Sequence, residues 1–309
     1  MAPFIQVAFK QYIGLAADTK PTGVPISSEA YEYDTKKLYV TYDGTNWVVK
    51  DSILFRASSG LLIAAGVISG TSHINKFGRN PDCDQAASAT AVNLRRSIWD
   101  SGIAGAVNWL APTVARIHQL KSTDTDDTSG GAGARTVQIY GLDSNYNLFD
   151  ETKTLDGTTN VPTSAFTMIY RMIVRSAGAT GYNEGDIIVT ADTDGTVTAK
   201  ITSKNNQSLM TQFMVPIGMK GYMTNYSGTI KKLGGVAKFA DIFLMSMKFG
   251  EVWRIRDSLS VAADGQNKFS HPFDPHKVFQ AKELIQLIAN PSADGQDISG
   301  GYDLILVED

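Results

Sequence analysis

The chain has 309 residues, of which 43% are hydrophobic and 19% are charged, and its formal net charge is −3. This composition supports a buried core and excludes an intrinsically disordered chain, while the charge excludes a basic surface for non-specific nucleic-acid binding. The single cysteine, Cys83, excludes an intrachain disulfide, which suits assembly in a reducing cytoplasm.

Apolar stretches predict neither a signal peptide nor a membrane span. The first residues have no long apolar run. The most apolar later segment, residues 53–70, contains Arg56, glycines and serines, and it is too short and interrupted for a bilayer. We therefore interpret it as a buried or partner-facing segment and expect no membrane partner.

Residues 1–52 are predicted to form an N-terminal arm with a small β-meander. Prolines punctuate residues 1–28, which favours an extended chain. Residues 29–50 alternate aromatic or β-branched positions with polar ones, which is typical of strands, and turn residues divide them into three. A three-stranded meander is too small to be stable alone. We expect it to pack on the rest of the chain or on another subunit.

Residues 53–106 are predicted to be a connector or docking segment. Gly78, Asn80 and Pro81 indicate irregular backbone. Residues 85–99 are compatible with a short helix, but their apolar positions are poorly periodic.

Residues 107–309 repeat one pattern of strand, turn and strand. The turns are rich in Gly, Asp and Asn, and the spacing is regular, which predicts a mainly β fold with a β-sandwich or jelly-roll-like body. Residues 282–290 also fit a helical stripe, but their flanking strands favour a strand. The predicted strands are residues 114–122, 134–143, 148–155, 165–177, 185–192, 196–202, 210–218, 220–232, 239–250, 251–262, 268–274, 282–290 and 301–309.

The candidate cation site comprises Asp143, Asn145 and Asn147, which match the first three ligand positions of a calcium loop. The glycine and the bidentate glutamate that an EF-hand requires are absent. Both flanks alternate as strands, so the sequence predicts a β-hairpin turn closed by Asx hydrogen bonds. The same interpretation applies to residues 192–195.

Motifs for catalysis are missing or incomplete. Asp150 and Glu151 are neighbours on a predicted strand and point to opposite faces, so they do not form the facing pair of a glycosidase. His271 and His276 lack a clear third metal ligand and are interpreted as loop histidines, with metal binding left open. The glycine-rich residues 130–135 lack the Lys-Ser/Thr ending of a phosphate loop. We expect a non-enzymatic protein without a cofactor.

Aromatic and basic side chains form the candidate interface. Five aromatic residues of the meander are suited to anchor a protein interface or to stack on sugars, and the small size of the meander favours a protein neighbour. Arginines of the connector are candidates to pair with carboxylates of a partner. The candidate interface residues are Tyr31, Tyr33, Tyr39, Tyr42, Trp47, Phe77, Arg79, Arg95, Arg96 and Trp99.

Three stretches resemble virion structural proteins of tailed bacteriophages. KPTGVPISSEAYEYDTKKLYVTYDGTNWV is similar to a Tyr-rich segment near the start of such proteins. HINKFGRNPDCDQA with RRSIWDSG, and the hairpin GARTVQIYGLDSNYNLFDETKTLDGTTNVPT, are similar to segments of one group of phage structural proteins. The ending GYDLILVED also resembles that group, whereas residues 94–96 depart from it because acidic residues are usual there.

The resemblance implies a virion component assembled in the host cytoplasm. The first hypothesis is a decoration or minor capsid protein that stabilises the capsid through inter-subunit contacts. The second is a tail or fibre component that binds a host-surface glycan through Trp47 and the tyrosines. An enzyme, such as a glycan-degrading tail protein, is disfavoured because no pair of catalytic groups is visible. Expected partners are major capsid or tail proteins and further copies of the chain, for example in a trimer.

Overall fold

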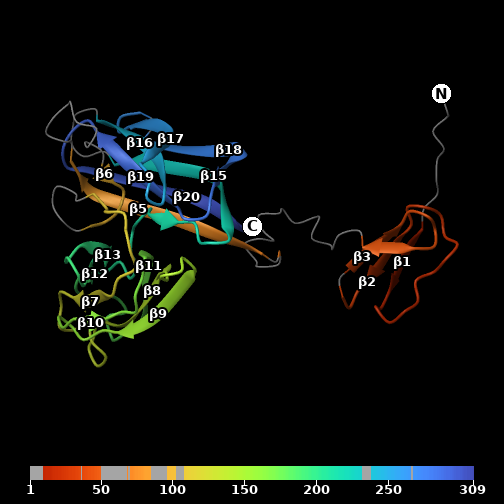
Figure 1. Ribbon diagram of the computed structural model, residues 1–309, viewed down its shortest axis with the longest axis horizontal. Coiled ribbons are helices and arrows are strands. Elements are labelled where there is room, and N and C mark those ends of the chain that lie inside the picture. Colours follow the sequence, from red (N-terminus) through yellow and green to blue (C-terminus); the bar gives the residue numbers. More distant parts are fainter. Residues whose placement is uncertain are drawn as a thin grey trace. The chain divides into compact units, whose positions relative to one another are not determined.

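The computed structural model describes residues 10–35, 37–49, 68, 70–84, 96–101, 108–231, 238–265 and 267–309. These residues form strands joined by turns and loops, and none of them belongs to a helix with the length and apolar character of a membrane span. The predicted mainly β fold is confirmed (Figure 1). The chain divides into two compact units, Met1–Ser72 and His73–Asp309, and each is described by itself.

The N-terminal unit is a single four-stranded sheet in the order β1-β2-β3-β4. The predicted meander is confirmed as β2, β3 and β4, which are antiparallel neighbours. The predicted extended lead-in contains an additional strand, β1, which pairs in parallel with β2. A four-residue parallel strand gives too little alternation to be found in a sequence. The strands are β1 (Gln11–Gly14), β2 (Glu29–Glu32), β3 (Lys37–Thr41) and β4 (Trp47–Val49).

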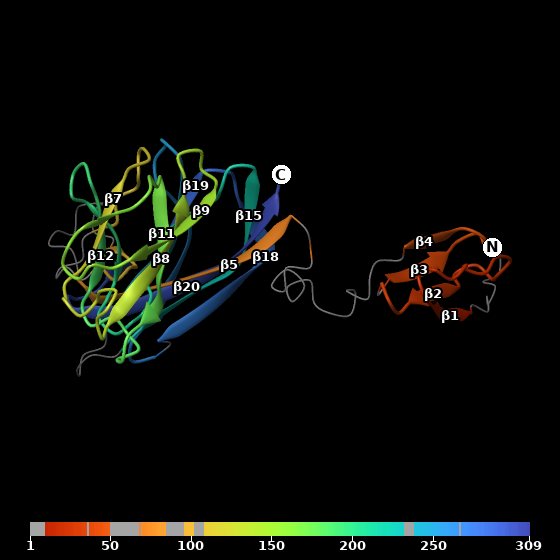
Figure 2. The ribbon, with the colours of Figure 1, turned by 90° about the horizontal axis from the view of Figure 1, so that it is seen from below.

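The second unit, called the body below, contains two β-sandwiches. In the first, the sheet β14-β19-β16-β17, with β6 beside β19, faces the sheet β18-β15-β20-β5. Figure 2 shows the long strands of the latter sheet running together. The strands are β5 (Thr71–Cys83), β6 (Arg96–Ser97), β14 (Phe213–Met214), β15 (Met219–Ile230), β16 (Phe239–Lys248), β17 (Arg254–Ala262), β18 (Lys268–Phe279), β19 (Glu283–Pro291) and β20 (Gln296–Glu308).

The second sandwich is inserted in the chain between β6 and β14, and we call it the inserted sandwich (Figure 1). It pairs the sheet β10-β7-β12-β13 with the sheet β11-β8-β9. Strands such as β7 and β8 largely alternate buried with half-buried positions, as expected for a sandwich in which one face of each sheet packs on the core. The strands are β7 (His118–Ser122), β8 (Ala134–Leu142), β9 (Leu148–Thr154), β10 (Val161–Pro162), β11 (Met168–Ala177), β12 (Ile187–Ala191) and β13 (Val197–Ile201).

One hydrophobic core continues through both sandwiches. At their junction, the rings of Tyr170 on β11 and Phe213 on β14 meet edge to face with centroids 5.0 Å apart. Strand β19 is buried along almost its whole length, and it lies inside its sheet with β16 on one side and β14 and β6 on the other. A strand buried on both faces reads as a continuous apolar run, which explains why its sequence also fitted a helical stripe.

The segment predicted to be an irregular connector is partly a strand of the body. Strand β5 runs for 13 residues at the edge of its sheet beside β20. Its inward positions are Lys76, Gly78 and Asn80, so no apolar alternation marks it. A Cβ atom on Gly78 would lie 2.5 Å from the carbonyl oxygen of Ile98, so close approach of the backbone requires this glycine. Most of the predicted 85–99 helix lies outside the described residues.

Candidate functional site

The sheet of the N-terminal unit buries polar side chains and exposes apolar ones. The apolar side chains buried among its described residues are Ala30 and Val40, and they are accompanied by Ser28, Glu32 and Thr41. A sheet of this size needs an apolar face against another surface to be stable. Among the described residues of the unit, the exposed large apolar side chains are Ile13, Leu15, Ile26, Tyr33, Tyr42, Val48 and Val49.

Polar contacts hold this small sheet together. The buried Glu32 carboxylate accepts hydrogen bonds from Lys20 Nζ at 2.5 Å and from Thr35 Oγ1 at 2.5 Å. The hydrogen bond with Lys20 is the main reason that the pKa of Glu32 lies below its usual value. Lys20 Nζ also lies 3.8 Å from the ring centroid of Tyr39. Such contacts fix local geometry but contribute less to the free energy of unfolding than apolar burial does. Because Ala30 and Val40 are the buried apolar side chains among its described residues, the unit has little core of its own.

Two of the predicted interface aromatics are used inside the N-terminal unit. The Trp47 indole N–H donates to the carbonyl oxygen of Pro21 at 2.8 Å, and its ring meets Tyr12 edge to face at 6.1 Å. The ring of Tyr39 lies beneath the ammonium group of Lys20. Trp47 is half-buried, so it does not offer an open platform for a sugar ring.

The remaining predicted aromatics of this unit differ in exposure. Tyr31 is half-buried, whereas Tyr33 is 48% exposed and Tyr42 is 69% exposed. Of the predicted meander residues, these two tyrosines therefore present the most aromatic surface.

The predicted interface residues of the body have mostly internal roles. Arg79 donates from Nε and Nη2 to the two carboxylate oxygens of Asp297 at 2.8 and 2.7 Å, and this bidentate pairing raises its pKa. Trp99, predicted at an interface, is instead buried in the core with 2% exposure. Arg96 is half-buried on β6, and Phe77 on β5 is 37% exposed.

Arg95 lies outside the described residues. Phe77 is thus the one predicted body residue, among those described, with an apolar side chain open to solvent.

The Asp143 turn is a hairpin turn, as predicted. Asp143 Oδ1 accepts hydrogen bonds from the backbone N–H groups of Asn145 at 2.8 Å and Asn147 at 2.9 Å. Tyr146 adopts φ of 67°, the left-handed conformation that such a turn requires. The Asp143 carboxylate therefore closes the turn through hydrogen bonds with Asn145 and Asn147.

The two histidines considered as metal ligands lie on strand β18 rather than in a loop, and their rings have separate partners. His271 Nε2 is 3.8 Å from Asp257 Oδ2, and His276 Nδ1 is 2.8 Å from the carbonyl oxygen of Phe273. Within the described part of the chain, no three His, Cys, Asp or Glu side chains gather in a way that could hold a metal ion.

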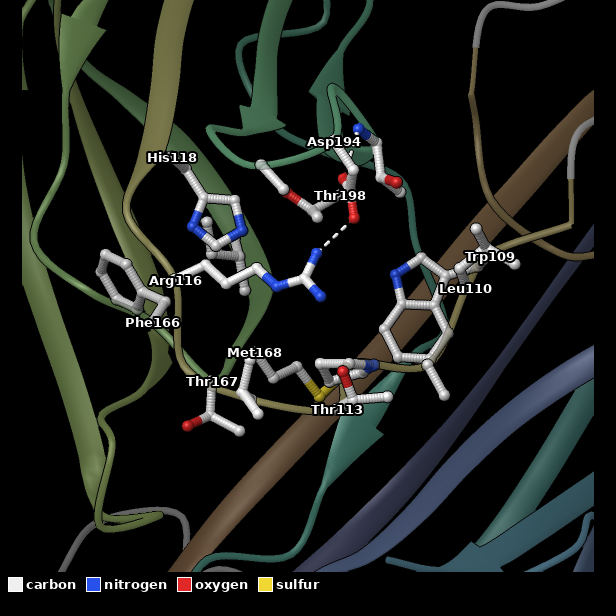
Figure 3. A pocket seen from close by; sticks show the side chains of 16 residues that line it. Trp109, Leu110, Thr113, Arg116, His118, Phe166, Thr167, Met168, Asp194 and Thr198 are labelled. Atoms are coloured by element: carbon white, nitrogen blue, oxygen red, sulfur yellow. Dashed lines mark hydrogen bonds and ion pairs between the residues drawn. The ribbon is translucent and has the colours of Figure 1, made fainter. Parts of the chain in front are cut away.

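A cavity of about 300 Å³ opens at one end of the inserted sandwich (Figure 3). Three distant segments supply its walls: residues 109–118 before and into β7, residues 166–169 at the start of β11, and residues 191–198 around the β12–β13 turn. Spacing in the sequence does not reveal such a site, and we did not predict it. The turn residues 192–195 were considered only as cation ligands.

Its polar wall is an ion pair beside a buried imidazole. Arg116 Nη1 bonds Asp194 Oδ2, and hydrogen bonds from Thr196, followed by that from Arg116, lower the pKa of Asp194 to about 2. His118 is buried and meets Phe166 edge to face at 6.5 Å. Burial lowers the pKa of His118, which favours the neutral imidazole.

The comparisons with known proteins give no family. No protein-family model matches the chain. No curated protein matches it either.

Among solved structures, the chain is similar to a chain in the structure of infectious bursal disease virus Gt strain. The two share 8% sequence identity, the match covers 78% of this chain and 73% of that chain, and the TM-score is 0.19. It is also similar to a chain in the crystal structure of the infectious bursal disease virus VP2 subviral particle. Here the sequence identity is 10%, the match covers 92% of this chain and 64% of that chain, and the TM-score is 0.19. A third similarity is to a chain in the structure of the Gx strain of that virus. The sequence identity is 9%, the match covers 78% of this chain and 73% of that chain, and the TM-score is 0.17. TM-scores this low carry no argument about fold or function.

Proposed function

We propose that this protein is a non-enzymatic structural component of a tailed-phage virion, which decorates or stabilises the capsid through contacts between subunits. The observation that carries the proposal is the exposed apolar surface of the N-terminal unit. Its sheet buries Ala30 and Val40 but leaves Ile13, Tyr42 and Val48 open to solvent. Exposed apolar side chains of this kind support attachment to another protein.

The sequence resemblance supplies the class of partner. The stretch that resembles the Tyr-rich segment of phage virion proteins, residues 20–48, contains β2, β3 and the start of β4 of this unit. We infer that the unit attaches to a major capsid or tail protein, and that copies of the chain associate, for example as a trimer. A lasting attachment requires an interface that buries roughly 1,000 Å² or more. We infer that the apolar side chains of one small sheet reach this area only when a neighbouring subunit contributes to the same interface.

A non-enzymatic role is supported by the side chains considered for catalysis. Asp150 accepts a hydrogen bond from Gln138, while Glu151 accepts two from Ser164, so the adjacent carboxylates serve different neighbours. The alternative of a tail or fibre component that stacks a glycan on Trp47 is disfavoured, because the indole is already packed against Tyr12.

The test is attachment of the full chain to purified particles of the phage that encodes it. Labelled chain is mixed with particles and sedimented, and the bound fraction is measured. We expect Tyr42→Asp and Val48→Asp to lower apparent affinity at least tenfold, because each places a charge on the exposed apolar surface. Thr19→Asp, at an exposed polar position of the same unit, is the matched control and should bind as the parent chain does. A chain that is strictly monomeric and does not bind particles would contradict the proposal.

A further inference from the structure

The cavity of the inserted sandwich has the size of a small-ligand site. Its volume of about 300 Å³ is at the lower end of the ~300–1,000 Å³ that is usual for ligand pockets. We propose that this cavity binds one sugar residue of a neutral saccharide. The inference is independent of the proposed attachment role, because the cavity belongs to the body and the apolar attachment surface belongs to the N-terminal unit.

The charges around the cavity favour a neutral ligand. The ionisable side chains that line it are Arg116, His118 and Asp194. The guanidinium and the carboxylate neutralise each other in a direct ion pair, and the imidazole is held neutral by burial. An anion would meet Asp194 and a cation would meet Arg116, so neither gains net attraction. A neutral ligand can use both groups at once.

The polar groups of the cavity suit hydroxyl groups. A guanidinium offers several N–H donors, a carboxylate offers acceptors, and a hydroxyl group needs both kinds of partner. Figure 3 shows the guanidinium of Arg116 reaching into the cavity between His118 and the Trp109 indole. Thr113 and Thr198 add hydroxyl groups to the same lining. Adjacent hydroxyls of a sugar ring can therefore be bound by the ion pair without breaking it.

The rest of the cavity is apolar and aromatic. Trp109, Phe166 and Met168 lie behind this lining and are at most 6% exposed, whereas Leu110 at 60% and Val114 at 56% present open apolar surface. A sugar ring has an apolar C–H face as well as a hydroxyl edge, and open apolar side chains can cover such a face. A lining that combines a polar pair with open apolar side chains matches both parts of a pyranose.

The polar wall is held in place before any ligand arrives. Arg116 and Phe166 exchange both backbone hydrogen bonds, at 3.0 and 2.9 Å. Asp194 Oδ1 accepts the backbone N–H of Thr196 at 3.0 Å, and the Asp192 N–H donates to the carbonyl oxygen of Ile117 at 3.0 Å. Binding groups that backbone hydrogen bonds already hold in place lose little freedom when a ligand binds.

The experiment screens the full chain against an array of neutral, sialylated and sulfated glycans, followed by saturation-transfer NMR with the neutral sugars that bind. We expect one or more neutral glycans to bind, and Asp194→Asn and Arg116→Gln each to weaken binding at least tenfold. Asp192→Asn is the matched control. Asp192 is exposed in the same turn and accepts a hydrogen bond from Gln119 Nε2 at 3.0 Å, but it does not line the cavity. Its binding should equal that of the parent chain.

Three outcomes would overturn the inference. The first is that no neutral glycan binds. The second is that anionic glycans, or nucleosides added as a comparison, bind in preference to neutral glycans. The third is that binding of neutral glycans survives Asp194→Asn and Arg116→Gln. Thermal unfolding of each variant is measured alongside. Should Arg116→Gln unfold, Asp194→Asn and Thr113→Val keep the test decisive, because both positions are exposed.

Discussion

Asp127 is the side chain on which the loops of the inserted sandwich depend most. It is fully buried, and its Oδ1 accepts the backbone N–H groups of Ala134 at 2.7 Å and Glu184 at 3.0 Å. Its Oδ2 accepts Ser122 Oγ at 2.6 Å and the Gly185 N–H at 2.9 Å. One carboxylate therefore joins the end of β7, the start of β8 and the loop before β12.

Asp127→Ala is expected to lower the free energy of unfolding by about 3 kcal/mol, because it leaves several buried donors without acceptors. Urea unfolding followed by circular dichroism measures the change. Asp126→Ala is the control: its side chain is exposed, so a change within about 0.5 kcal/mol is expected. Equal effects of the two substitutions would contradict the role given to Asp127.

Burial determines the chemistry of Cys83. It is the largest cause that raises the pKa of the thiol to about 12, and the neighbouring carboxylates of Asp84 and Asp82 also raise it. In the native protein at pH 8 we expect no reaction with a thiol reagent such as DTNB, and complete reaction after unfolding in guanidinium. Reaction of the native thiol at the rate of the unfolded chain would contradict the burial of Cys83.

The same burial links the stability of the body to pH. The unfolded thiol has a pKa of 9.0, below the folded value of about 12, so the unfolded state binds fewer protons between these values. The stability contributed by the neutral thiol is fully present below pH 9 and is lost as the pH rises toward 12. We expect the fall in unfolding free energy from pH 8 to pH 10.5 to be smaller in Cys83→Ala than in the parent chain. Identical pH profiles would contradict this linkage.

At the scale of elements, the two sheets of the first sandwich approach closely where β15 has a glycine. A Cβ atom on Gly228 would lie 2.4 Å from Ile242 Cδ1 on β16 and 2.8 Å from Phe269 Cε1 on β18. Gly228→Ala is therefore expected to cost about 1–3 kcal/mol in unfolding free energy through overpacking. Gly265→Ala, in a turn where a Cβ atom would meet nothing within 4 Å, is the control and should be nearly neutral. Chemical denaturation of both variants distinguishes a packing effect from a general loss of glycine flexibility.

Individual strands were predictable to the extent that one face of each is apolar. The hairpin of β8 and β9 was predicted in both strands and in its turn, because alternation and turn chemistry agree there. Strand β5 was missed because its inward positions carry Lys76, Gly78 and Asn80. Alternation also does not say which strands share a sheet. The division of the predicted single body into two sandwiches therefore became visible only in three dimensions.

The functional residues were less predictable than the strands. The exposure of Tyr42 and the burial of Trp99 depend on tertiary packing, which residue type alone does not fix. The cavity residues Trp109, Arg116 and Asp194 come from segments that only the sheet pairing brings together. Residue spacing detects a site when its ligands are close in sequence, whereas the paired Arg116 and Asp194 are 78 residues apart.

At the scale of the whole molecule, the two units differ in how their stability arises. The body has a continuous apolar core, whereas the N-terminal unit buries Ala30 and Val40 among polar side chains. Because β5 begins at Thr71 and pairs within the body, a chain that starts at Gly70 retains every described strand of the body. We expect this truncated chain to fold, with a melting temperature within about 3 °C of the body transition in the full chain.

The truncated chain separates the two proposed activities. Without the exposed apolar surface of the N-terminal unit, it should no longer sediment with phage particles. It should still bind neutral saccharides as the full chain does, since Arg116 and Asp194 and the other cavity residues remain in the body. Sedimentation with particles and saturation-transfer NMR on the same preparation measure the two properties. If the truncated chain binds particles as tightly as the full chain, attachment belongs to the body. If it folds but loses saccharide binding, the sugar site lies in the N-terminal unit instead.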